Sequence, residues 1–341
     1  MRATGRSRWR LWSAWLAACL AAGPADAITI EVDYGYDTSQ FFGVGNPQGP
    51  AAGAQARAAL EAAAGYFTAI LDDSFSPISV PAPFLSGVSD GIVTWQWTSA
   101  FNHPSTGNPV SLAGQTLAAD EYVVFAGARN LSSTGLSSPG GYSWTTNFSG
   151  SFSFAEVAQI NSITNAFQDQ VERRGESSGF ARWGGTVSFD TIPPTPWHFD
   201  HSVMPSAGSL DFYSVALHEL AHSLGFGASN EWDQWVTGLA FHGPNAQASY
   251  GAAVPLADAG HWAGEIASVV FGGSASQAPL MSSVAPNGLR TLFTDLDGAG
   301  MTDIGWTIVP EPASAVLLFI VFVARGAAAV RSCGDLRYRQ R

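Results

Sequence analysis

Two histidines and a glutamate lie within five consecutive residues of an otherwise apolar stretch, and side chains of these types can hold a metal ion and move a proton. The stretch runs from His218 to Gly227, HELAHSLGFG, and contains the pattern HExxHxxG. In an α-helix His218 and His222 are one turn apart, roughly 6 Å along the axis, so both imidazoles can reach one metal ion. Glu219 lies off the line that joins them, which suits a carboxylate that acts on a water molecule without binding the metal.

The residues around this pattern predict a helix by themselves. Ser209 or Asp211 can cap its start, and Gly225 and Gly227 can end it in a turn. Without a metal, three polar side chains on this helix would need other partners to offset their desolvation. The sequence therefore favours a metal site over incidental buried histidines. Apolar side chains recur every four residues and form one broad face, away from the histidines: Phe212, Ala216, Leu220 and Leu224, widened by Tyr213, Leu217 and Ala221.

A third metal ligand must come from elsewhere, because a catalytic zinc site usually has three protein ligands and one open position. We expect this ligand to be His261, since the preceding Gly260 gives the backbone room to turn the imidazole inward. His242 is the next choice. Carboxylates after the helix offer further alternatives: Glu231, Asp233 and Glu265. Three histidines precede the helix and are expected to be structural or surface residues: His103, His198 and His201.

The HExxHxxG helix resembles that of the metzincin metallopeptidases. In metzincins with the continuous motif HExxHxxGxxH the third histidine would fall at residue 228, which is alanine here. A histidine deferred to position 261 and followed by Leu280-Met281, which is similar to the methionine turn beneath the zinc, resembles the leishmanolysin-type group. The resemblance covers about residues 205–306, although Ser282-Ser283 departs from the Ala-Pro that often follows the methionine. It rests on His218, Glu219, His222, Gly225, His261 and Met281.

The fold expected from the sequence is α+β. The resemblance implies a metzincin-like zinc peptidase, in which a mixed twisted sheet and helices lie above the active-site helix and the lower subdomain is mostly irregular. We expect one catalytic domain over residues 28–309, with an upper part at about 28–227 and a lower part at about 228–309. Strands are predicted at 28–33, 78–80, 91–97, 121–126 and 185–190, the last lining the substrate cleft. Further helices are predicted at 52–71, at 154–171 and from 295 to about 304, whereas 102–118 and 132–150 indicate loops.

Both ends of the chain carry signals of export. Residues 1–27 resemble a secretory signal cleaved after Ala27, with a lipidated Cys19 as the alternative. Residues 310–341 resemble the PEP-CTERM sorting signal of Gram-negative bacteria: Pro310-Glu311-Pro312, an apolar run over 313–324 and five arginines. That resemblance implies recognition by an exosortase, transient contact with the inner membrane, and an extracellular, cell-surface or exopolysaccharide-associated product. A plain C-terminal membrane anchor is the alternative, although the apolar run is shorter than the roughly 20 residues of a membrane span.

The charge of the chain argues against some classes of partner. There is no lysine, and residues 28–309 carry six arginines against 24 acidic residues, a formal net charge of −18. Such a charge argues against nucleic acid and anionic membrane surfaces as partners. Both cysteines, Cys19 and Cys333, lie outside residues 28–309, so the predicted domain cannot use a disulfide framework.

The expected function is that of a secreted or cell-surface zinc endopeptidase acting on proteins or peptides. In this hypothesis Zn²⁺ is bound by His218, His222 and His261, and Glu219 is the general base that activates water. The substrate backbone would add as a strand to residues 185–190. Two alternatives stay open: a catalytically inactive metzincin-fold protein that binds envelope or matrix material, and a zinc hydrolase of cell-wall amide bonds.

Overall fold

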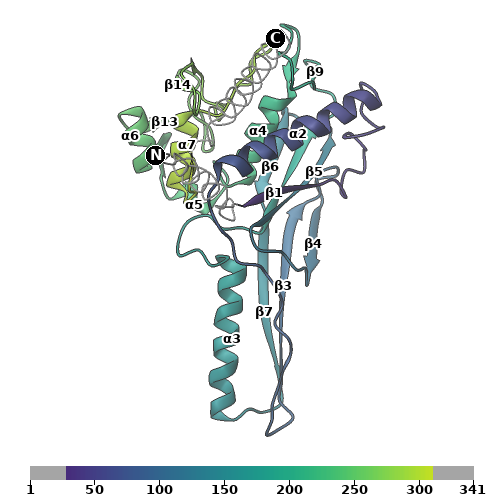
Figure 1. Cartoon of the computed structure of the whole chain (residues 1–341), viewed down its shortest axis with the longest axis vertical. Coiled ribbons are helices and arrows are strands. Elements are labelled where there is room, and N and C mark those ends of the chain that lie inside the picture. Colours follow the sequence, from purple (N-terminus) through teal and green to yellow (C-terminus); the bar gives the residue numbers. More distant parts are fainter. Residues whose placement is uncertain (1–27, 310–341) are drawn as a thin grey trace, which may run out of the picture.

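The computed structural model describes residues 28–309, and the expected export and sorting segments, 1–27 and 310–341, lie outside the described residues. Within this range the chain forms a mixed α+β fold with two four-stranded sheets, of which one lies in the body and the other extends into a long arm (Figure 1). None of the helices in residues 28–309 is long and apolar enough to cross a bilayer.

The central sheet of the body has the order β1-β5-β8-β6. Its strands are β1 (Thr29–Asp33), β5 (Glu121–Arg129), β8 (Gly184–Asp190) and β6 (Gly135–Pro139). The first three run parallel, and β6 runs antiparallel to β8. Every residue of β8 is buried, as expected for a strand inside a sheet that is covered on both faces.

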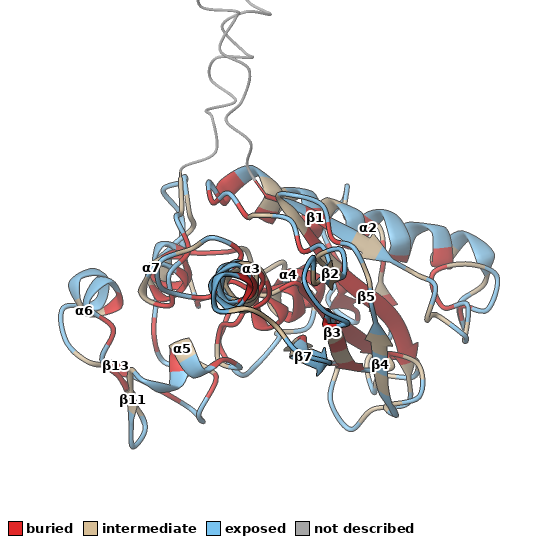
Figure 2. Cartoon of the chain, turned by 90° about the horizontal axis from the view of Figure 1, so that it is seen from below, coloured by how far each residue is buried: buried red, intermediate tan, exposed pale blue. Residues whose placement is uncertain are grey.

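Two helices pack against this sheet and against each other: α2 (Pro50–Ile70) and α4 (Phe212–Ser223). The α2 helix is rich in alanine, a strong helix former, and begins with Pro50, whose fixed φ suits the first helical position. Together with α4 it buries one large apolar core (Figure 2). Residues of α2 in this core include Ala56, Leu60, Ala63 and Phe67.

The second sheet is antiparallel and centred on β3 (Ile92–Asn102). On one side lies β7 (Gly141–Ser149), and on the other lie β2 (Phe84–Leu85) and β4 (Pro109–Ala113). We call β3, β7 and the helix α3 (Phe154–Glu172) the arm, because they extend together away from the body (Figure 1). A separate small core joins helix and strands and includes Trp95, Trp97, Ile160, Phe167 and Val171.

The remaining elements are short and are joined by long loops. Before α4, β9 (Trp197–His198) pairs with β10 (Leu210–Asp211). After α4 come α5 (Asn230–Asp233), β11 (Val236–Thr237), β12 (Ala240–Phe241), α6 (Pro244–Tyr250) and β13 (Val254–Pro255). They are followed by β14 (Ser268–Val269), β15 (Ser276–Gln277) and α7 (Asp295–Asp303).

The four helices predicted from local patterns are all present, as α2, α3, α4 and α7. The prediction of loops at 102–118 and 132–150 was wrong, because these ranges contain β4, β6 and β7. Pairing with β3 and β8 stabilises these strands despite their many Gly, Ser and Pro residues. The strand predicted at 78–80 was also wrong, since only an isolated bridge joins Ile78 to Leu117.

Candidate metal centre

The helix α4 presents the first two histidines, and its ends form as its sequence predicts. Asp211 is the N-cap, and its side chain accepts hydrogen bonds from the backbone N and the Oγ of Ser214 (3.2 and 2.7 Å). Arg290 donates two further bonds to the same carboxylate, at 2.9 and 2.8 Å. After the helix ends at Ser223, Gly225 takes a φ of 99°, which glycine adopts without strain. The helix is therefore fixed at both ends close to the histidines.

Three histidine side chains meet beside α4. The Nε2 atom of His222 lies 3.0 Å from that of His218 and 3.1 Å from that of His261, and the remaining distance, His218 to His261, is 3.2 Å. In residues 28–309 these three side chains form the group whose ligand atoms are close enough together to hold a metal ion. The loop after α4 thus brings His261 to the pair, whereas His242 is exposed and lies outside the group.

The hydrogen bonds of the Nδ1 atoms determine what the Nε2 atoms can do. Because a carbonyl or carboxylate oxygen can only accept, each bound Nδ1 carries the ring hydrogen, and the Nε2 atom of the neutral ring presents a lone pair. Three lone pairs at these distances repel one another unless a cation lies between them. The Nδ1 partners are Leu280 O for His218 (2.9 Å), Phe226 O for His222 (2.7 Å) and Asp258 Oδ1 for His261 (2.8 Å).

The donor set fits a zinc ion. Tetrahedral zinc with Zn–N bonds of about 2.0–2.1 Å places its ligand nitrogens about 3.3 Å apart, close to the separations found here. Burial lowers the pKa of His218 to about 4 and holds the pKa of His222 well below its ordinary value. Both rings are therefore neutral at pH 7, the state in which imidazole binds metals.

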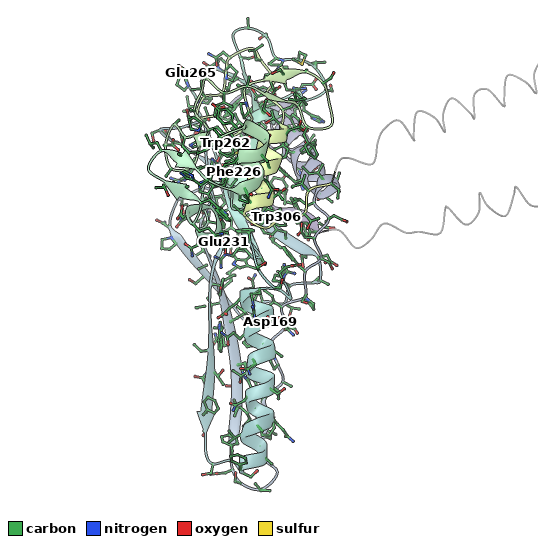
Figure 3. The ribbon with its side chains drawn as sticks, turned by 90° about the vertical axis from the view of Figure 1, so that its left-hand side faces the viewer. Asp169, Phe226, Glu231, Trp262, Glu265 and Trp306 are labelled. Carbon is green, nitrogen blue, oxygen red and sulfur yellow. The ribbon has the colours of Figure 1, made fainter. Side chains whose placement is uncertain are left out.

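Close contact between two glycines brings the loop of His261 to the end of α4. Gly227 has a φ of 65°, and a Cβ atom on it would lie 2.4 Å from the carbonyl oxygen of Gly260. Only glycine lets the two backbones approach so closely. The next residue after the histidine, Trp262, is fully buried and lies against Phe226 with ring centroids 5.2 Å apart (Figure 3). Both neighbours of His261 in sequence are thus fixed by packing.

The loop with Met281 is joined to His218 and to the loop of His261 by hydrogen bonds to its backbone. Leu280 O accepts the bond from His218, and Met281 O accepts one from Trp262 N at 2.9 Å. Asp297, at the start of α7, is fully buried and accepts from Leu280 N, Met281 N and the indole Nε1 of Trp262 (2.9, 3.1 and 3.0 Å). One carboxylate therefore holds the methionine loop and the loop of the third histidine together.

The candidate general base, Glu219, is 5% exposed. Its Oε2 accepts a hydrogen bond of 2.7 Å from Ser137 Oγ on β6. Burial raises the pKa of this carboxyl to about 7, although the bond from Ser137 acts in the opposite direction. A carboxylate with a pKa near neutrality can take up and release a proton during one reaction cycle.

A cavity of about 60 Å³ opens beside the candidate base. His218 and Glu219 line one wall, and the residues after Met281 line another. Apolar residues in its lining include Leu210, Val215, Leu280, Val284 and Leu289.

The prediction that a substrate backbone adds as a strand to residues 185–190 was wrong. This strand is β8, whose two edges are already occupied by β5 and β6. The strand next to α4 at the edge of the sheet is β6, which contacts Glu219 through Ser137. Its residues were expected to form a loop.

The other candidate residues lie apart from the three histidines. Ala228 is exposed, and Glu231 forms an ion pair with Arg182 at 3.8 Å. Glu231 and Glu265 also lie well apart from each other in the body (Figure 3). The three histidines before α4 make contacts of their own: His103 accepts from Ser105 N, His198 contacts Val203 O, and His201 lies beside the ring of Tyr213.

Three residues that support the centre had no assigned role in the sequence analysis: Ser137, Asp258 and Asp297. The spacing Thr294-x-x-Asp297 is a capping-box signal, and it does form the start of α7. Asp258 lies three residues before His261, so a local hydrogen bond between them could have been predicted. Ser137 is 82 residues away from Glu219 and gave no local signal.

A comparison of the chain with models of known protein families, with curated proteins and with solved structures found no match.

Proposed function

We propose that this protein is a zinc-dependent endopeptidase of the metzincin type, similar to the leishmanolysin-like group. The observation that carries the proposal is the convergence of three Nε2 lone pairs, from His218, His222 and His261, beside the buried carboxylate of Glu219. The buried methionine loop, which accepts a hydrogen bond from His218, and the α+β body also support it. Ala228 does not count against a third ligand, because the Nε2 atom of His261 lies 3.2 and 3.1 Å from those of His218 and His222.

Zinc, when bound, supplies a Lewis acid that polarises a peptide carbonyl and makes water more acidic. Glu219 takes a proton from the attacking water as the oxygen adds to the carbonyl carbon. It then delivers the proton to the nitrogen of the leaving amine, so the carboxylate is restored at the end of each cycle.

The substrate in this proposal lies along β6 in an extended conformation. The edge of this strand that faces away from β8 can pair with a peptide backbone, which makes affinity independent of most side chains. One side chain of the peptide enters the cavity next to Glu219. The lining of the cavity combines apolar residues, such as Val215 and Leu289, with polar ones, such as Ser214 and Thr291.

We also propose that the protein is exported and reaches the outside of a Gram-negative cell. This part rests on the sequence patterns of 1–27 and 310–341, which lie outside the described residues. Its partner would be an exosortase-type sorting enzyme.

The test measures metal content and proteolysis in the purified protein. We expect about one zinc per chain, cleavage of casein, loss of cleavage with a chelator and its return on adding zinc. Glu219→Gln should keep the zinc and lower cleavage by at least about 100-fold, since a general base contributes about 10²- to 10⁴-fold. Zinc-loaded wild-type protein without proteolysis would favour the binding protein, and release of amines from cell-wall material alone would favour the amide hydrolase.

A further inference from the structure

The strand β6 contacts both oxygens of the candidate base. Ser137 Oγ donates to Oε2 of Glu219 at 2.7 Å. Gly135, two residues earlier, lies so close that a Cβ atom on it would be 2.4 Å from Oε1. In residues 28–309, the bond from Ser137 is the hydrogen bond that the structure gives to this carboxylate.

The pleat of the strand explains why these two residues act together. Side chains of a strand alternate between its faces, so positions 135 and 137 point to the side of α4, and Leu136 and Ser138 point to the other. Pairing of Gly135 with Phe189 and of Ser137 with Val187 fixes this register against β8. A shift by one residue would remove the hydroxyl from Glu219.

We propose that Ser137 is a positioning residue for Glu219, an inference that rests on the proposed function. Its hydroxyl holds Oε2, so Oε1 is left to exchange protons, and Gly135 keeps the space in which Oε1 lies. Since β6 is also the strand proposed to pair with substrate, the backbone that aligns the peptide and the side chain that aligns the base belong to one rigid element. Seating of the peptide and orientation of the base are thereby linked.

The first experiment compares Ser137→Ala with Ser137→Thr, which keeps the hydroxyl. We expect kcat of Ser137→Ala to fall about 10- to 100-fold, the effect of losing a hydrogen bond to a charged group, with KM and zinc content unchanged. Ser137→Thr should recover most of kcat. Ser143→Ala, on an exposed position of β7, is the control for loss of a serine and should keep the wild-type kcat.

The second experiment is structural and does not need activity. Crystal structures of zinc-loaded Ser137→Ala and Gly135→Ala should show the Glu219 carboxylate displaced, because the first lacks its donor and the second fills its space. If the wild-type protein cleaves no substrate, the proposed function fails, and the position of this carboxylate alone decides the role of Ser137. An unmoved carboxylate, or a Ser137→Ala variant with wild-type kcat, would overturn the inference.

Discussion

Two capping boxes in this protein share the same local pattern but have different structural roles. Thr294 and Asp297 start α7 near the candidate metal centre, and Ser153 and Glu156 start α3 in the arm. In each, the acidic side chain bonds the backbone N of the cap residue. Asp297 is fully buried and also holds the two loops of Met281 and His261, whereas Glu156, 9% exposed, bonds Ser86 and Gly87 beyond its own cap.

The difference extends to the apolar residues around each box. Near the candidate metal centre Trp262 and Met281 are fully buried in the large core of the body. The arm has its own smaller core, and Phe148 and Phe154 at its end are 62% and 93% exposed. We infer that the whole body stabilises the metal centre, whereas the arm depends on a few local contacts. Changes in one region should leave the other region intact.

The largest effect is expected when one of the proposed metal ligands is removed. His261→Ala should lower zinc affinity by more than about 100-fold, because loss of only a hydrogen-bond partner of a ligand already costs about 10- to 100-fold. Zinc content after dialysis against a competing chelator measures the effect. His242→Ala, the same change at an exposed histidine outside the centre, should keep the wild-type affinity. Equal zinc retention by both variants would remove His261 from the ligand set.

The parts of the candidate centre that depend on contacts within one segment could be predicted from the sequence, and the part that depends on distant pairing could not. The α4 helix and its caps followed from residues within one segment, and His261 followed from the adjacent glycine. The role of β6 could not be predicted, because its strand conformation comes from pairing with β8, about 50 residues later in the chain. Its Gly and Ser residues indicate a loop when taken alone, and tertiary pairing overrides that preference.

The second test concerns Asp297. Asp297→Ala leaves several buried donors without a partner, among them Leu280 N, Met281 N and the indole of Trp262. At about 1–3 kcal/mol for each unsatisfied buried group, partly relieved by relaxation, we expect the free energy of unfolding to fall by about 3–5 kcal/mol. Urea unfolding measures this loss, and zinc affinity should fall with it. Glu156→Ala is the matched change in the arm and should leave zinc affinity unchanged.

The smallest expected effect is a difference in how the stability contributed by each capping box depends on pH. Hydrogen bonds from Ser153, Gly87 and Ser86 lower the pKa of Glu156 to about 2, below the 4.5 of a free glutamate. The charged form is therefore favoured in the folded arm, and its stabilisation is complete above about pH 4.5 and is lost as the pH falls toward 2.

Burial acts in the opposite direction on Asp297, whose pKa is raised above 3.8. Protonation of Asp297 accordingly favours the folded state, and its contribution to stability decreases as the pH rises through the shifted pKa. The difference in unfolding free energy between wild type and Glu156→Gln should thus shrink on acidification from pH 5 to pH 2, and that between wild type and Asp297→Asn should not shrink. Urea unfolding at several pH values measures both differences. If the two differences changed in parallel, the electrostatic contrast between Asp297 and Glu156 would be wrong.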